Sequence, residues 1–168
     1  MNPPLSYFSR RCYEDIEVGD SLPTVVKGPL SPAHLVRWCG AIENWHRIHY
    51  DTGFATVHEG LPERLVNGSW KQHLLVQVLK DWAGSDGWVW KLSFQFRGMD
   101  VVWDTLTGWG RVIGKEEVGG LGFIKCEIGI ENQKGVNTTQ GSAVVVVPLR
   151  AGSDVPYPFN PPAGLGVQ

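Results

Sequence analysis

Residues able to transfer protons gather in one short segment of the chain, from Glu43 to Asp51. Two histidines, one arginine and two carboxylates fall within its nine residues. His49 is the best candidate for acid and base catalysis, because an unperturbed imidazole pKa of about 6.5 lets a proton be taken up and returned near neutral pH. The alternative is that His49 is only a hydrogen-bonded surface or core residue.

The same segment has one feature of a metal site. His46 and His49 stand three residues apart, which could place both imidazoles on one face of a helical turn, with Glu43 or Asp51 as a further ligand. A third strong ligand at a convincing interval is missing, and the known zinc spacings are absent. We therefore expect no metal.

A second candidate site lies where Asn67, Gly68 and Ser69 begin an apolar helix. The first N–H groups of a helix have no partner within it, and they carry the positive end of its dipole. The N–H groups of Gly68 and Ser69 could hold a thioester carbonyl and stabilise the enolate oxygen formed when a proton leaves Cα. The alternative is that Asn67 or Ser69 only caps the helix.

Two helices and several strands must position these segments. Ser31 and Pro32 favour a helix that runs to about Ile42. Residues 68–82 predict a mostly buried helix, with one face formed by Leu75, Val78, Leu79 and Trp82. Strands are expected at residues 23–27, 88–97, 105–113, 124–131 and 142–149.

Short glycine-containing links between successive strands predict an antiparallel meander, whose concave face must cover the long helix. The fold class is therefore α+β, a sheet wrapped around a helix. Residues 1–150 are expected to form this single domain. Residues 151–168 are rich in proline and glycine, so this tail is expected to be extended or disordered unless a partner subunit orders it.

Composition narrows the choice of partners. The chain has 168 residues, is 42% hydrophobic and has a net charge of −2, which suits one globular domain. It has no run of Lys or Arg, which argues against nucleic acid or anionic membrane as principal partner. No membrane-length apolar stretch or secretory signal is present, so we expect a cytoplasmic protein.

The chain has eight Trp and three Cys, which are Cys12, Cys39 and Cys126. We expect these residues to pack in the core and in subunit interfaces.

The proton-transfer segment resembles the hydratase motif of the MaoC-like branch of the hotdog superfamily, and the resemblance extends from about Tyr13 to Leu149. The matching positions are Ile48, His49, Asp51, Ala55 and the Asn67-Gly68 pair. The string from His46 to Asp51, HRIHYD, is more similar to the subgroup with 3-hydroxyacyl-thioester dehydratases of the mitochondrial type and mesaconyl-C4-CoA hydratase. The resemblance implies a hotdog fold and an (R)-specific enoyl-CoA hydratase or 3-hydroxyacyl-CoA dehydratase, a lyase with no metal or redox cofactor.

The resemblance also implies site residues. His49 would transfer protons, Asn44 would position water or the hydroxyl group, and Gly68 would hold the thioester oxygen. Further contacts with the acyl-CoA substrate are expected from His46, Arg47, Asp51, Asn67, Ser69 and Trp70, and the aromatic strands would line an acyl tunnel.

The sequence departs from the family at two positions. Asn44 stands five residues before His49, where the family commonly has a catalytic Asp, and an amide cannot carry a proton at neutral pH. A single imidazole could serve both steps of a syn elimination, with Glu43, His46 or Asp51 as possible second proton carriers. Trp103 stands where the family usually has Gly, and its indole could reshape the acyl pocket or a subunit contact.

Two rival functions remain open, and both keep the hotdog fold. The lack of an acid at Asn44 also suits a non-catalytic subunit that binds acyl-CoA and completes a heteromeric enzyme. A hotdog thioesterase is the third hypothesis, and release of free CoA thiol would identify it. Hotdog sheets generally join edge to edge, so the resemblance implies a homodimer or higher homo-oligomer, or a heteromer with another hotdog subunit.

Overall fold

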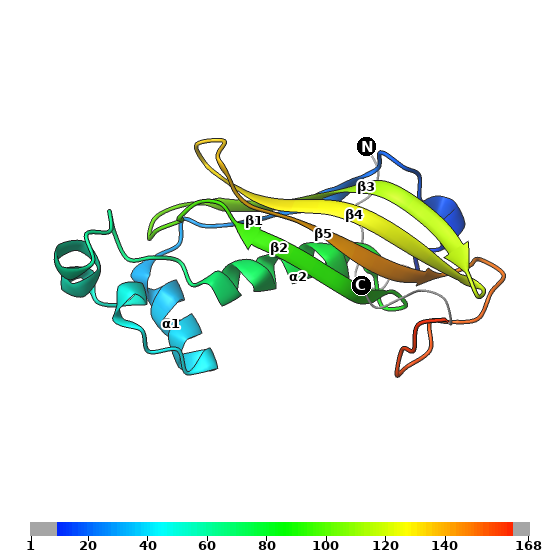
Figure 1. Cartoon of the computed structure of the whole chain (residues 1–168), viewed down its shortest axis with the longest axis horizontal. Coiled ribbons are helices and arrows are strands. Elements are labelled where there is room, and N and C mark those ends of the chain that lie inside the picture. The colour runs from blue at the N-terminus through cyan, green and yellow to red at the C-terminus, as the bar shows by residue number, and fades with distance from the viewer. Residues whose placement is uncertain (1–9, 163–168) are drawn as a thin grey trace.

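A five-stranded antiparallel sheet curves over one long helix, α2 (Gly68–Ala83), as Figure 1 shows. The computed structural model describes residues 10–162. The strands are β1 (Ser21–Lys27), β2 (Trp88–Phe96), β3 (Leu106–Val118), β4 (Leu121–Asn132) and β5 (Asn137–Pro148). The remaining elements are η1 (Tyr13–Asp15), α1 (Pro32–Ile42), η2 (Arg47–His49) and the π-helix η3 (Phe54–His58). The bounds expected for α1 are confirmed, and the strand expected at residues 88–97 ends one residue earlier, at Phe96.

The strand order is β1-β3-β4-β5-β2, so β1 and β2 are the edges of the sheet. The expected meander is correct for β3, β4 and β5. Gly119 and Gly120, the two residues between β3 and β4, have φ angles of 61° and 76°, as a type I′ hairpin turn requires.

The meander is wrong for β2, which pairs with β5 and not with the next strand, β3. Residues 97–105 pass the start of α2, where the N–H of Val66 donates to the carbonyl of Asp100. The chain crosses that end of the sheet before β3 begins on the far side of the β4–β5 pair. Local strand patterns indicate where strands form, but not which strand pairs with which.

Apolar side chains of α2 fill the concave side of the sheet. The predicted helix face is confirmed, because Leu75, Val78, Leu79 and Trp82 are all buried. They share one cluster with the inward residues of β4, which are Ile124, Cys126, Ile128 and Ile130. Each fully buried side chain of this size contributes roughly 1.5–3 kcal/mol, so the core fixes α2 against the sheet.

A bulge interrupts the alternating aromatic face expected for residues 88–97. The pairing of β2 with β5 shifts between Val89 and Lys91, so Trp90 lies in the bulge. Leu92 and Phe94 pack against the main core, whereas Trp90 packs with the cluster on the other side of the sheet. The aromatic residues of β2 therefore divide between the two faces.

The described part of the tail, residues 149–162, contains no helix or strand. Val155 and Phe159 pack there against Phe123 and Val146, in a cluster on the sheet face opposite α2. Figure 1 shows the tail at the end of the molecule far from α1. The domain boundary at residue 150 stays a prediction. Residues 1–9, part of the segment searched for a signal, and 163–168 lie outside the described residues.

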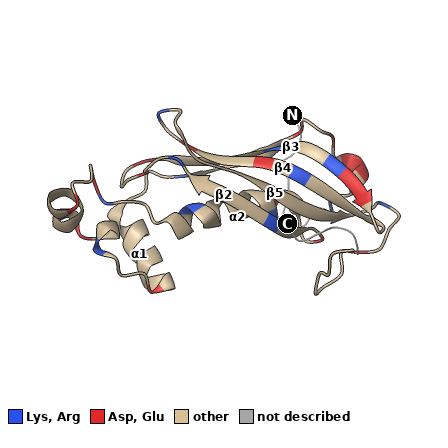
Figure 2. Cartoon of the chain, in the orientation of Figure 1, with Lys and Arg blue, Asp and Glu red and all other residues tan. Residues whose placement is uncertain are grey.

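Charged and reactive groups are dispersed. Figure 2 shows short, separated Lys and Arg segments and no continuous basic stripe in this view.

Cys12, Cys39 and Cys126 are buried and unpaired, as expected for packing residues. No helix within residues 10–162 is both long and apolar enough to cross a membrane.

Candidate active site

His49 lies at the end of η2 and is buried, with 7% of its surface exposed. Its Nδ1 atom is 2.8 Å from the carbonyl oxygen of Leu65. A carbonyl oxygen can only accept a hydrogen bond, so Nδ1 must carry the proton that it donates. The neutral imidazole therefore has an unprotonated Nε2, which is the state that a general base needs.

Main-chain pairing holds this imidazole beside the segment that leads into α2. The N–H of Leu65 donates to the carbonyl of Ile48 at 2.9 Å, and the carbonyl of Leu65 accepts from the ring of His49. Leu65 also forms an isolated antiparallel bridge with Val101. Helix α2 begins three residues after Leu65, at Gly68. One short stretch of backbone thus links the candidate base to the candidate oxyanion site.

The first turn of α2 leaves one N–H group free. Asn67 is the N-cap, and its Oδ1 accepts the N–H and the hydroxyl of Ser69 at 2.9 and 2.5 Å. The N–H groups of Trp70 and Lys71 donate to the carbonyl of Asn67 at 3.0 and 3.2 Å. Among the described residues, the N–H of Gly68 has no acceptor. Of the two N–H groups expected to hold a thioester oxygen, that of Ser69 is therefore occupied and that of Gly68 is available.

Ser69 and Trp70 contribute to packing between the two helices. The indole Nε1 of Trp38 donates to the hydroxyl of Ser69 at 2.9 Å, which fixes α1 against α2. Trp70 packs against the main core and, with Trp38 and His73, lines a cavity of about 320 Å³. Their expected contacts with substrate stay predictions.

Asn44 and His46 shape the loop before η2. The Oδ1 of Asn44 accepts the N–H of His46 at 3.2 Å, and the Nδ1 of His46 accepts the N–H of Ile48 at 3.4 Å. The exposed ring of His46 lies 6.2 Å from the ring of His49, centroid to centroid. No hydrogen bond within residues 10–162 occupies the amide nitrogen of Asn44, so this nitrogen is the end of the side chain that is available to orient water.

Arg47 and Asp51 form an ion pair at the rim of this loop. The guanidinium Nη2 of Arg47 is 2.7 Å from Oδ2 of Asp51, and Oδ1 of Asp51 accepts the N–H of Phe54 at 3.0 Å. Hydrogen bonds from the Phe54 N–H and from Arg47 lower the pKa of Asp51 below its ordinary value. Asp51 is thus ionised at neutral pH and is a poor proton carrier, which leaves Glu43 and His46 as the alternatives.

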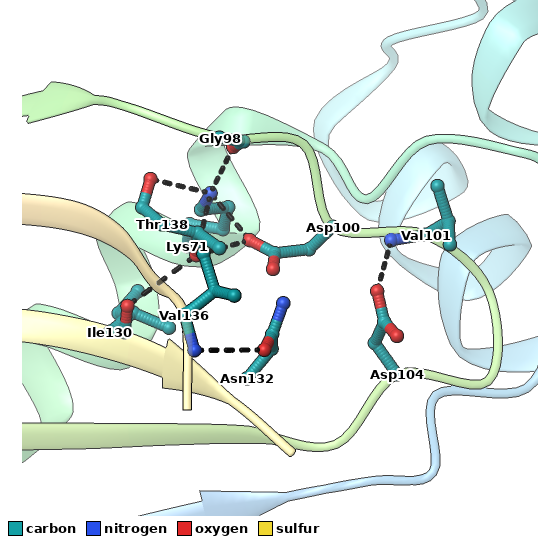
Figure 3. Close-up of polar contacts among 9 residues, drawn as sticks. All are labelled: Lys71, Gly98, Asp100, Val101, Asp104, Ile130, Asn132, Val136 and Thr138. Atoms are coloured by element: carbon teal, nitrogen blue, oxygen red, sulfur yellow. Dashed lines mark hydrogen bonds and ion pairs between the residues drawn. The ribbon is translucent and has the colours of Figure 1, made fainter. Parts of the chain in front are cut away.

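Sequence reasoning missed a buried ion pair beside the first turn of α2 (Figure 3). Nζ of Lys71 is 2.6 Å from Oδ2 of Asp100, and the two side chains are 4% and 0% exposed. Thr138 donates its hydroxyl to the same carboxylate oxygen at 2.6 Å, and Lys71 donates to the carbonyl of Gly98 at 3.2 Å. No local pattern signals this pair, because its members lie 29 positions apart.

A larger cleft, of about 690 Å³, lies at the other end of α2, away from the candidate base. It is lined by the start of β2, including Trp88 and Trp90, and by the tail residues 154–157. None of the predicted site residues lines it. Within residues 10–162, no three His, Cys, Asp or Glu side chains are arranged to hold a metal.

The architecture places the chain in the hotdog class, and solved structures share it. The (R)-hydratase from A. caviae involved in PHA biosynthesis has a TM-score of 0.72 and 22% identity, covering 80% of this chain and 99% of that chain. The ChsH1–ChsH2 complex from Mycobacterium tuberculosis has a TM-score of 0.68 and 21% identity, covering 78% and 98%. R-hydratase PhaJ1 from Pseudomonas aeruginosa has a TM-score of 0.72 and 18% identity, covering 92% and 96%. At these identities the likeness establishes the fold.

The family is established by the segment that contains the candidate site. Residues 20–104 match the family model described as hydroxyacyl-thioester dehydratase type 2. This span includes His49, Gly68 and the buried Lys71–Asp100 pair. The chain belongs to the hydroxyacyl-thioester dehydratase type 2 family. No curated protein sequence matched the chain.

Proposed function

We propose that this protein interconverts a 3-hydroxyacyl-CoA and the corresponding enoyl-CoA by removal or addition of water. The observation that carries the proposal is the hydrogen bond between Nδ1 of His49 and the carbonyl of Leu65, three residues before α2 begins, which leaves Nε2 of the neutral ring unprotonated. Membership of the family supports the reaction class. CoA as the thiol carrier and (R)-stereochemistry are expectations from the resemblance.

In the dehydration direction, Nε2 of His49 takes the Cα proton, and the electron pair of that C–H bond moves towards the thioester carbonyl. The free N–H of Gly68 stabilises the resulting enolate oxygen. The electrons then return, the Cβ–O bond breaks, and the proton on Nε2 leaves with the hydroxyl group as water. One imidazole serves both steps because syn elimination places proton and hydroxyl on the same side. Only a proton and a hydroxyl group move, so we propose no metal or redox cofactor.

Position 44 has a hydrogen-bonding amide, Asn44, where the family commonly has a catalytic Asp. Its amide nitrogen is available among the described residues, whereas its oxygen is held by the N–H of His46. We therefore propose that Asn44 donates a hydrogen bond to the β-hydroxyl group or the attacking water. His46 and Glu43 are the candidates for exchange of the catalytic proton with solvent, since both are exposed.

Self-association is part of the proposal. Strand β2 pairs only with β5 within the described residues, so its other edge is available. An unpaired strand edge is a template for a second strand. We propose that two copies, or this chain and another hotdog subunit, join through this edge.

The test is to incubate the purified protein with short, branched and aromatic enoyl-CoA esters, following loss of the conjugated enoyl-thioester absorbance and the product mass. We expect a gain of one water, and at least a ~100-fold lower turnover in His49→Ala. The matched control is His58→Ala, because this imidazole is exposed and outside the proposed machinery. Equal turnover in His49→Ala and wild type would contradict the proposal, and release of free CoA thiol would indicate a thioesterase.

Two observations favour a second candidate, a non-catalytic subunit of a heteromeric hydratase. Asn44 cannot transfer a proton, and one of the similar structures is the complex of two different chains, ChsH1–ChsH2. Binding of enoyl-CoA esters by the purified chain without turnover would favour this candidate, and turnover after addition of a partner chain would establish it.

A further inference from the structure

A buried hydrogen-bond donor without a partner lies next to the free N–H of Gly68. Asn67 is 4% exposed, and its amide nitrogen Nδ2 has no hydrogen-bond partner among the described residues. Such a group costs about 1–3 kcal/mol when left unpaired, so native structures rarely keep one without a use. An unpaired donor at the candidate oxyanion site points to a bound acceptor.

The orientation of this amide is fixed by its neighbours. Its oxygen accepts both the N–H and the hydroxyl of Ser69, and the indole of Trp38 donates to the same hydroxyl. Rotating the amide would put its NH₂ group against the N–H of Ser69, where two donors would meet. Nδ2 therefore points away from Ser69 and cannot be exchanged with the oxygen.

An aromatic ring covers the start of α2. The ring of Phe96, the last residue of β2, lies so close to Gly68 that a Cβ at that position would be 2.8 Å from its Cζ atom. Phe96 is nevertheless 51% exposed, so about half of its surface is open to solvent. Its ring lies edge-to-face with the ring of Phe94, and Nζ of Lys71 is 5.1 Å from its centroid. Movement of this half-exposed ring would uncover Gly68 at the loss of these two contacts.

We propose that Nδ2 of Asn67 and the N–H of Gly68 together hydrogen-bond the carbonyl oxygen of the thioester, which reaches them when Phe96 turns outward. This assignment rests on the proposed function for its substrate class. It makes Asn67 a catalytic residue in addition to an N-cap. Two donors on one oxygen form the arrangement that stabilises an enolate, and removal of one donor from such a site lowers kcat by roughly 10²–10³-fold.

Asn67→Asp separates the two roles of this residue. Aspartate is as good an N-cap as asparagine, and its carboxylate can accept the same two hydrogen bonds from Ser69. It has no N–H to donate, and its charge repels an enolate. Asn67→Ser is a second, uncharged variant that also caps helices well. Asn160→Asp is the control for added charge, because Asn160 is exposed in the tail.

We expect kcat on an enoyl-CoA to fall at least 100-fold in both Asn67 variants, with a much smaller change in KM and an unchanged circular dichroism spectrum. Asn160→Asp is expected to match wild type. A residue that only caps the helix would keep wild-type kcat as aspartate. Turnover within about threefold of wild type in either folded variant would therefore overturn the assignment.

A binding measurement keeps this inference separate from the proposed function. Saturated butyryl-CoA with ¹³C at the thioester carbonyl cannot be dehydrated, and hydrogen bonds to its oxygen move the carbonyl resonance downfield. We expect the downfield shift on binding to wild type and a reduced shift with Asn67→Asp. Equal shifts, or no shift with wild type, would overturn the inference. An inactive wild type that still gives the difference would refute only the proposed function.

Discussion

Replacing Lys71 by methionine tests the buried ion pair most directly. Methionine has nearly the same length, so the change removes the charge while it leaves little empty space. Among the described residues, Asp100 then keeps only the hydroxyl of Thr138 on Oδ2, and its Oδ1 already has no partner. Removing one member of a buried pair costs about 3–5 kcal/mol, because the remaining charge is buried without compensation. The melting temperature should fall by roughly 6–20 °C for a chain of this size.

The assay is urea unfolding at pH 7, followed by tryptophan fluorescence, for Lys71→Met, Asp100→Asn and the double variant. The double variant removes both charges, so it should lose at least about 1 kcal/mol less than the sum of the two single changes. Arg111→Met is the control. Its ion pair with Glu127 has side chains that are 57% and 46% exposed, and such a pair contributes about 0–1 kcal/mol.

A loss below about 1 kcal/mol in Lys71→Met would refute this reasoning, since it would mean that water or another cation compensates Asp100. Additive effects in the double variant would show that the two side chains do not interact energetically. A change in the urea m-value would point instead to an altered denatured or native state.

Three further predictions concern single residues. Trp103 has φ of 75°, a conformation unfavourable for a bulky residue, so Trp103→Gly should raise stability by about 1 kcal/mol in urea unfolding; a loss would contradict this. Burial raises the pKa of Cys126 from 9.0 to about 12, so the unfolding free energy should fall as pH rises across this interval, and less steeply in Cys126→Ala. The lowered pKa of Asp51 stabilises the fold above its ordinary value of 3.8 and less as pH falls below it, so Asp51→Asn should show a shallower acid decline.

Local patterns predicted the two long helices and the five strands, but β3 runs five residues past its expected end and β5 begins five residues before its expected start. The Ser31-Pro32 pair marks the start of α1 because a capping residue and a proline both suit a first turn. Alternation over residues 88–97 gave the start of β2 and placed its end one residue too late. The position of β2 next to β5 was not predicted, because pairing between strands depends on contacts distant in sequence. The bulge at Trp90 has no signal of its own, since the alternation of apolar and other residues continues through it in the sequence.

The candidate site was predicted in part. The residue types of the segment containing His49 pointed to proton transfer, but its tautomer depends on the carbonyl of Leu65, which lies 16 positions away. The Lys71–Asp100 pair had no local signal, because a charged residue on a helix is normally expected to face solvent. Trp103 did carry a signal. The family usually has glycine there, and Trp103 has a positive φ in the structure, a conformation that favours glycine.

Residues 65–68 connect the buried ion pair to the chemistry. Leu65 holds the ring of His49, the N–H of Val66 donates to the carbonyl of Asp100, and helix α2 follows directly. The carboxylate of Asp100 is in turn paired with Lys71, which lies in the first turn of α2. The side chains of Asp100 and Lys71 therefore fix this segment without a hydrogen bond to His49, Asn67 or Gly68 among the described residues. It follows that Lys71→Met should lower kcat even at temperatures where it remains folded, because the Leu65 carbonyl that orients the imidazole loses its support.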